Sequence, residues 1–310
     1  MYTTIKPPKL KEGDEIRVVA PAWAPDIKDL SKGIEILRHM GFKVSLGKNI
    51  KRLAQVYYLS APDKDRASEL IDAFKDDSVN AIFCGGGGYG SMRILPYLDF
   101  DLIRDHPKIF LGYSDITALH VAINNFAHLV TFHGPMPGPD VDEMKKPTYK
   151  NFIEVLKGDN RDINPPQGRI IKYVISGKAT GISMGTNFSL VASLVGTKYL
   201  KEAKERILFL EDVSTTVWDI DRYFATLKLA GLLDDFEGFV FGDFTDIPKT
   251  EDAMPVMEEI VEYHMANANK PSLYGMPFGH GDEQMLIPLN AKIKMQTEQP
   301  YLELLEDVVE

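Results

Sequence analysis

The sequence has 310 residues, of which 44% are hydrophobic and 26% are charged, and its formal net charge is −10. This composition is that of an ordinary globular protein, and the length suits one large domain or two of average size. The acidic balance argues against a nucleic-acid-binding protein, which usually needs a basic face. A single cysteine, Cys84, excludes an intrachain disulfide and a cysteine-based zinc site, and we expect it to be a buried, small apolar residue at the end of a strand.

The chain contains no targeting or membrane signal that can be recognised from its residues. No apolar run approaches the roughly 18 residues that would predict a membrane helix. The first stretch, MYTTIKPPKLKEGDEIRVVA, lacks the charged-then-apolar layout of a secretory signal. We therefore expect a cytoplasmic protein that binds neither membranes nor nucleic acid.

The first part of the chain alternates between predicted strands and predicted helices. Buried-strand patterns occupy 15–22, 42–47, 79–84 and 108–112. Helical spacing of apolar residues occupies 29–40, 63–74, 91–98 and 115–126. Such alternation is typical of βαβ units and predicts a mostly parallel sheet.

The pattern changes after about residue 135. The segments PMPGPDVDEMKKPT and NPPQG are rich in proline, glycine and charge, and they flank one helical segment. Strand-like runs then dominate, together with a helix over 221–230 that ends before Gly231. We therefore predict an α/β domain over 1–150, a linker over 151–172 and a smaller, β-rich domain over 173–310.

A serine lies on the predicted turn between a strand and a helix, in KIFLGYSDITALH. At such a turn the Ser114 hydroxyl is exposed, and the first N–H groups of the helix are free to stabilise negative charge. An acyl-transfer nucleophile needs both features. The turn resembles the G-x-S-x-G elbow but lacks its last glycine. The alternative is that Ser114 only caps the helix.

The run GGGGYG, at 85–90, follows a predicted strand and formally fits G-x-G-x-x-G. A dinucleotide site would also need an acidic residue at the end of the next strand, where this chain has the serine turn instead. Glycines after a strand also let backbone N–H groups approach a ligand oxygen. We therefore interpret the run as the second part of an oxyanion hole, with a purely structural turn as the alternative.

An activated serine needs a histidine base and a carboxylate that orients it. Among the seven histidines, His280 is flanked by glycine on both sides, and His133 follows a strand and is its rival. Glu211 ends the apolar run RILFL, and Asp212 beside it is an equal candidate from the residues alone.

Taken together, these blocks make the sequence resemble the LD-carboxypeptidase family of serine peptidases, which includes the microcin C immunity peptidases. The resemblance runs nearly from end to end. It is carried by GGYGSMRILPYLD, GYSDITALH, HGPM, GTNFSLVASLVGT, LFLED, IDRYFATLKLAG and GHGDEQMLIPLNAKI. Several distinct blocks in the right order are far more specific than any one of them.

The resemblance implies a catalytic triad of Ser114, Glu211 and His280 that needs no metal or cofactor. It also implies an oxyanion hole formed by backbone N–H groups of Asp115 and of Gly87 or Gly88. The implied fold is a flavodoxin-like N-terminal domain and a β-rich C-terminal domain with the site between them, commonly in a homodimer. Many members have an arginine where this chain has Gly86, so any role for that side chain is in doubt here.

The implied substrate is a cytoplasmic muropeptide tetrapeptide, which would be cleaved between the L-centre of its third residue and a terminal D-alanine. Arg93 and Arg222 are candidates, by charge only, for binding the free carboxylate, and the alternative for both is a surface ion pair. Two other functions remain open. One is hydrolysis of an amide in a peptide–nucleotide conjugate, as in the microcin C relatives, and the other is an inactive, ligand-binding homologue.

Overall fold

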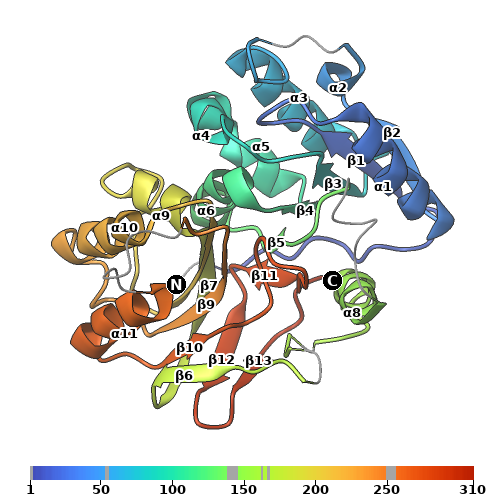
Figure 1. Ribbon diagram of the computed structural model, residues 1–310. Helices are drawn as coiled ribbons and strands as arrows, with labels where there is room; N and C mark the ends of the chain where they lie inside the picture. The colour runs from blue at the N-terminus through green and yellow to red at the C-terminus, as the bar shows by residue number, and fades with distance from the viewer. Residues whose placement is uncertain (1–2, 53–55, 138–145, 162, 166–167, 249–255) are drawn as a thin grey trace.

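Two β-sheets form the frame of the molecule, as the computed structural model in Figure 1 shows. The structure describes residues 3–52, 56–137, 146–161, 163–165, 168–248 and 256–310. Within these residues the first sheet has six strands in the order β11-β5-β4-β3-β1-β2. The second has seven strands in the order β13-β12-β7-β8-β9-β10-β6. A mixed α/β fold with a parallel sheet and a second sheet is therefore confirmed.

The first sheet is parallel except at one edge. Its strands are β1 (Glu15–Val19), β2 (Lys43–Leu46), β3 (Ala81–Cys84), β4 (Ile109–Gly112), β5 (Thr131–His133) and β11 (Ile287–Leu289). The first five have the spatial order 2-1-3-4-5, the flavodoxin-like order. β3 and β4 are buried at every position, which is why they consist of apolar runs without alternation. β11 comes from the C-terminal part of the chain and pairs antiparallel with β5.

Helices cover both faces of this sheet. They are α1 (Ile27–His39), α2 (Lys48–Arg52), α3 (Asp63–Lys75), α4 (Ser91–Ile94), α5 (Phe100–Asp105), α6 (Thr117–Phe126) and α8 (Lys146–Lys157), with the 3-10 turns η1 (Leu95–Tyr97) and η2 (Ser114–Ile116). α1 begins earlier than predicted because the Asp26 carboxylate accepts hydrogen bonds from the N–H groups of Lys28 and Asp29.

The second sheet has a parallel centre and antiparallel edges. Its strands are β6 (Lys172–Ile175), β7 (Lys178–Asn187), β8 (Arg206–Val213), β9 (Gly238–Thr245), β10 (Ser272–Tyr274), β12 (Lys292–Gln296) and β13 (Tyr301–Leu304). The strands β7, β8, β9 and β10 run parallel. The helices α9 (Phe188–Leu194), α10 (Val217–Leu229) and α11 (Met257–Ala268) lie beside this sheet (Figure 1). α10 begins before the predicted helix, because Thr216 and Asp219 form a capping box.

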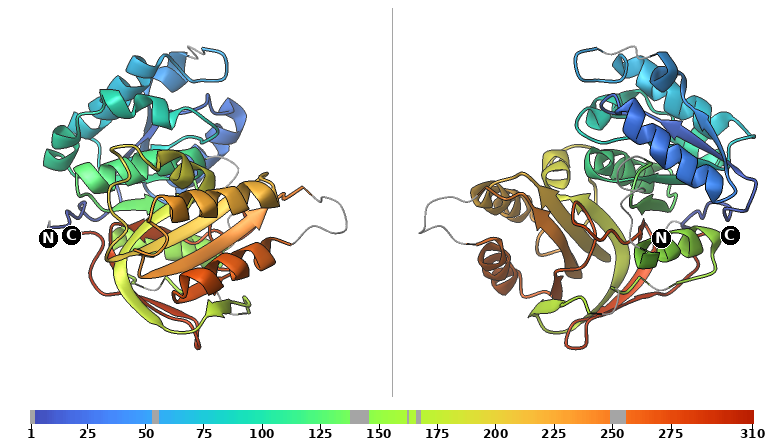
Figure 2. Two further views of the ribbon diagram at one scale, coloured as in Figure 1. Left: turned by 90° about the vertical axis from the view of Figure 1, so that its left-hand side faces the viewer. Right: turned by 45° about the vertical axis from the view of Figure 1, so that its right-hand side comes forward.

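The two halves of the molecule, one built on each sheet, share their hydrophobic cores. One cluster joins Phe110 of the first sheet to Phe188 and Leu210 of the second half. Another joins Leu111 to Phe209. Lys9, near the N-terminus, contacts the last residue, since its N–H donates to the Glu310 carbonyl at 2.8 Å, and the right-hand view of Figure 2 shows the C-terminus beside α8. The linker over 151–172 and the two domain ranges stay predictions.

Cys84 is fully buried at the end of β3, as expected. Burial raises the pKa of its thiol well above the ordinary value. Among the described helices, none combines the length and the apolar character that crossing a membrane would need.

Candidate active site

The serine turn lies at the carboxyl end of β4. Ser114 is half-buried and has φ +61°, a left-handed conformation that a residue with a side chain adopts only under strain. Gly112 makes the turn possible, because a Cβ there would lie 2.9 Å from Ile116 Cγ2 and 3.1 Å from Cys84 Cβ. The strained geometry of a nucleophile elbow is therefore present, with Ile116 where the usual motif has its last glycine.

The glycine turn, residues 85–90 directly after β3, packs against this serine. A Cβ built on Gly87 would lie 3.0 Å from Ser114 Cβ, 3.2 Å from Ser114 Oγ and 3.5 Å from the Asp115 nitrogen. Gly88 has φ +89°, and a Cβ there would meet the Trp23 ring at 2.4 Å. Position 88 thus requires glycine, a Cβ at position 87 would crowd Ser114, and the structure brings Gly87 and the Asp115 N–H to the same side of Ser114.

Glu211 and His280 form a hydrogen-bonded pair. His280 Nδ1 lies 2.6 Å from Glu211 Oε2, and Glu211 is fully buried near the end of β8. The His280 side chain is 15% exposed, and the centroid of its ring lies 4.9 Å from the centroid of the Tyr113 ring. Tyr113 immediately precedes Ser114 in the chain. The pair from the second half therefore reaches the serine turn of the first half.

The structure separates the two candidate carboxylates. Asp212 points away from His280 and accepts hydrogen bonds from the N–H groups of Ser189 and Val213, both at 2.8 Å. Burial, and then the nearby charge of Glu211, raise the pKa of Asp212 to about 6. Asp212 thus holds the first turn of α9, whereas Glu211 holds His280.

The rival base His133 is engaged elsewhere. It is buried at the end of β5, and its Nδ1 lies 2.5 Å from Thr186 Oγ1. Burial, followed by the charges of His120 and His280, holds the pKa of His133 well below its usual range. His120 donates from Nε2 to the Gly112 carbonyl at 2.8 Å, which supports the strand end before the serine turn.

The two candidate arginines both form ion pairs on helix surfaces. Arg93 binds Asp63 at 2.9 Å, and Arg222 binds Asp219 at 2.8 Å. Their role in substrate binding stays a prediction. At Gly86, a Cβ would come no closer than 3.8 Å to Pro25, so this position has room for a Cβ.

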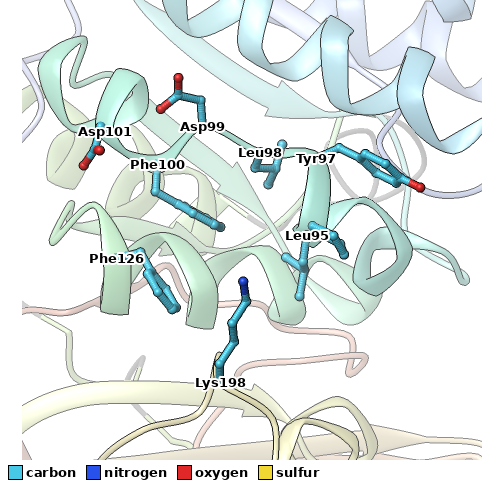
Figure 3. Close-up of a pocket in the computed structure, with 9 residues that line it drawn as sticks. Leu95, Tyr97, Leu98, Asp99, Phe100, Asp101, Phe126 and Lys198 are labelled. Carbon is cyan, nitrogen blue, oxygen red and sulfur yellow. The ribbon is translucent and has the colours of Figure 1, made fainter.

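A cavity of about 500 Å³ lies apart from these residues, and Figure 3 shows the side chains that line it. Asp99 and Asp101 are among the lining residues, but Asp99 caps α5 through the Leu102 N–H and Asp101 pairs with Arg104. None of the candidate catalytic residues lines it. Over the residues that are described, no cluster of three or more His, Cys, Asp or Glu side chains is arranged to hold a metal ion.

Sequence reasoning missed the polar residues that support the glycine turn. The Asp115 carboxylate accepts a hydrogen bond from the Ser91 N–H at 2.8 Å, and the Ser91 hydroxyl donates to the Asp115 carbonyl. Arg66 is fully buried beneath the same turn. The available signals were the acidic residue directly after the serine and a cation near the start of the 63–74 helix.

A serine on a strained turn above a parallel sheet, near a carboxylate-bound histidine, is typical of the α/β serine hydrolases. The family model described as LD-carboxypeptidase N-terminal domain matches residues 16–134, and the model of the C-terminal domain matches residues 180–295. The chain therefore belongs to the LD-carboxypeptidase family and is a hydrolase of the carboxypeptidase class.

Individual relatives agree with this assignment. The chain is 38% identical over 299 residues to the probable murein peptide carboxypeptidase of Bacillus subtilis, which covers 94% of this chain and 92% of the relative. It is 27% identical to the microcin C7 self-immunity protein of Escherichia coli, over 93% of this chain and 91% of the relative. A crystal structure of a related immunity-like protein from Bacillus anthracis superposes with a TM-score of 0.85 at 29% identity, over 97% and 99% of the two chains.

Proposed function

We propose that the protein is a serine LD-carboxypeptidase that removes the terminal D-alanine from cytoplasmic muropeptide tetrapeptides. The observation that carries the proposal is the 2.6 Å contact between His280 Nδ1 and the fully buried Glu211, with the His280 ring against the residue that precedes Ser114. The relative named as a murein peptide carboxypeptidase supports the choice of substrate.

The proposed mechanism follows from the roles that these groups take. His280 accepts the proton of the Ser114 hydroxyl through Nε2, and the serine oxygen forms a bond to the scissile carbonyl carbon. Glu211, on Nδ1, fixes the tautomer and stabilises the imidazolium. The N–H groups of Asp115 and of Gly87 or Gly88 stabilise the oxyanion, each by about 3 kcal/mol. His280 then protonates the leaving amine, the amide bond breaks, and water hydrolyses the acyl-enzyme.

The first experiment is mass spectrometry of L-Ala–D-Glu–diaminopimelate–D-Ala after incubation with the wild type and with Ser114→Ala. We expect the wild type alone to release alanine, because the variant lacks the nucleophile. Release by both proteins would assign the reaction to another nucleophile. Release by neither, with Ser114 intact, would contradict the proposed substrate.

A second candidate substrate is a peptide–nucleotide conjugate, since the chain matches the microcin C7 self-immunity protein over most of its length. The same serine would cleave an amide in such a molecule. Turnover of a peptidyl-aminoacyl adenylate mimic, with no turnover of the tetrapeptide, would favour this candidate. Absence of turnover of the mimic would remove it.

The alternative of an inactive homologue and the homodimer that the resemblance implies each have their own test. An inactive homologue that binds nucleotides through 85–90 would retain NAD or ATP in equilibrium dialysis, and we expect no retention. The homodimer is tested by light scattering, which would give a mass of twice 34.8 kDa. A mass of one chain would contradict it.

A further inference from the structure

One peptide unit, between Gly90 and Ser91, is held at both of its polar ends by buried charged side chains. Arg66 Nη1 donates to the Gly90 carbonyl at 2.9 Å, and the Asp115 carboxylate accepts from the Ser91 N–H at 2.8 Å. Arg66 is fully buried and Asp115 is 2% exposed. A cation therefore faces the negative end of the peptide dipole, and an anion faces its positive end.

The alternative orientation of this peptide is strongly disfavoured. A flipped peptide would place the carbonyl oxygen against the Asp115 carboxylate and the N–H against the Arg66 guanidinium. Both contacts would be repulsive, and burial strengthens the repulsion because the local dielectric is low. Gly90 has φ +123°, and a Cβ on it would lie 2.5 Å from Leu59 Cδ2, so only glycine fits this position. Glycine also adopts many other backbone conformations, so the residue by itself does not fix the orientation of the peptide. The two charges supply the restraint that this backbone lacks.

The same peptide ends the glycine turn that faces the nucleophile. Gly87, three residues earlier, packs against Ser114 and the Asp115 nitrogen. The Ser91 hydroxyl also donates to the Asp115 carbonyl, so the turn and the residue after the nucleophile are joined twice. The Gly90–Ser91 peptide is therefore the point at which the glycine turn is fixed to the residue that follows Ser114.

We propose that Arg66 and the Asp115 side chain are positioning residues that lock the Gly90–Ser91 peptide and thereby hold the two parts of the oxyanion hole in register. This inference rests on the proposed serine mechanism. The two side chains do not touch the reacting atoms, and they act through the backbone. Donors that are about 1 Å out of place lose much of their effect on the transition state, at a cost of about 10²-fold in rate.

The test compares Asp115→Ala with Glu69→Ala. Glu69 is a matched control, because it is also buried in the first half and accepts from two backbone N–H groups, those of Ala20 and Asn49. Within the described part of the chain, the Glu69 side chain makes no hydrogen bond to the glycine turn. We expect Asp115→Ala to lower kcat on the tetrapeptide about 10²-fold with KM within twofold of wild type. Glu69→Ala should lower the melting temperature but keep kcat.

A conservative variant and a second readout make the test independent of folding and of the substrate. Asp115→Asn keeps an acceptor oxygen for the Ser91 N–H, so it should lose less kcat than Asp115→Ala, and it carries the test if the alanine variant does not fold. The rate at which a fluorophosphonate modifies Ser114 should fall in the same order. In that reaction the serine oxygen displaces fluoride from phosphorus and His280 takes the proton, with no peptide involved.

The outcomes separate the inference from the proposed function. Equal kcat and equal phosphonylation rates in wild type and both Asp115 variants would overturn the proposed positioning role. A loss that appears in KM or in melting temperature, but not in kcat, would also overturn it. If the fluorophosphonate modifies Ser114 of the wild type but the tetrapeptide stays intact, the proposed substrate is rejected. The phosphonylation rates of the variants then still test the positioning role. A wild type that reacts with neither compound would reject the serine mechanism and the positioning role together.

Discussion

Gly279 lies directly against Glu211, and its lack of a side chain gives that carboxylate its place. Gly279 has φ +101°, and a Cβ on it would lie 2.6 Å from both Glu211 Cγ and Glu211 Oε2. Oε2 is the oxygen that holds His280. A single methyl group here would push the carboxylate away from the imidazole, because no real Cβ tolerates such a contact.

If the proposed mechanism holds, we expect Gly279→Ala to lose most tetrapeptide hydrolysis, on the order of 10²-fold or more, because Glu211 can no longer orient His280, the proposed base. Gly13→Ala is the matched control. Gly13 has φ +87° with nothing within 4 Å of a built Cβ, so this variant carries the backbone strain, about 1 kcal/mol, without the collision. Steady-state kinetics of both variants checks the prediction. Equal activity in the two would show that the contact with Glu211 is unimportant.

At the scale of elements, β8 directs two adjacent carboxylates to opposite sides. Successive residues of a strand point to opposite faces. Glu211 therefore contacts the His280 loop, residues 275–286 between β10 and β11, while Asp212 contacts the N-terminal turn of α9. The β8–β9 register shifts between Leu210 and Asp212, which marks an irregularity at Glu211 itself. The strand thus separates a role in the site from a role in capping a helix.

The raised pKa of Asp212 predicts that the stability of the protein depends on pH. This pKa is about 6 in the folded protein, chiefly through burial, and near 3.9 when unfolded. The folded state therefore holds this proton more tightly, so the stabilisation is fully present below pH ~4 and is lost as the pH rises through about 6. Relative to Asp212→Asn, the wild type should lose about 3 kcal/mol across that window and then stay level. Urea unfolding of both proteins at several pH values measures it, and a difference that does not vary with pH would contradict the prediction.

At the scale of the whole molecule, β11 ties the two halves together. The chain leaves the second sheet after β10, passes through the His280 loop, and adds β11 to the edge of the first sheet beside β5. It then returns to the second sheet as β12. The two halves also share hydrophobic clusters. We therefore expect neither half to unfold without the other.

The two tryptophans of the sequence test this, because Trp23 lies in the first half and Trp218 on α10 in the second. Trp218→Phe leaves Trp23 as the only reporter, and Trp23→Phe leaves Trp218. We expect the two variants to show the same urea midpoint by fluorescence, matching the midpoint by circular dichroism. Circular dichroism of each variant also controls for effects of the substitution itself. Separate midpoints for the two halves would refute a single cooperative unit.

Local patterns in the sequence predicted much of the fold and of the candidate site. The apolar runs of β3 and β4 and the glycine–serine turn have short-range signatures. β11 could not be placed, since IPL is a three-residue strand whose partner lies far away in the chain. Arg66 and Asp115 are visible in the sequence only as a cation within a helix and an acid after the serine, because the peptide that both contact is brought to them by the fold.

The path of the His280 loop between two sheets also has a consequence for amide exchange with solvent. His280 lies between β10 in one sheet and β11 in the other, so fraying of β11 would release one end of the segment that carries this proposed base. Protection of the backbone amides of β11 then measures how often the base is set free. An opening that costs about 3 kcal/mol would leave under one molecule in a hundred with a detached base. Exchange rates in these few residues would therefore give the fraction of the enzyme that is ready to react.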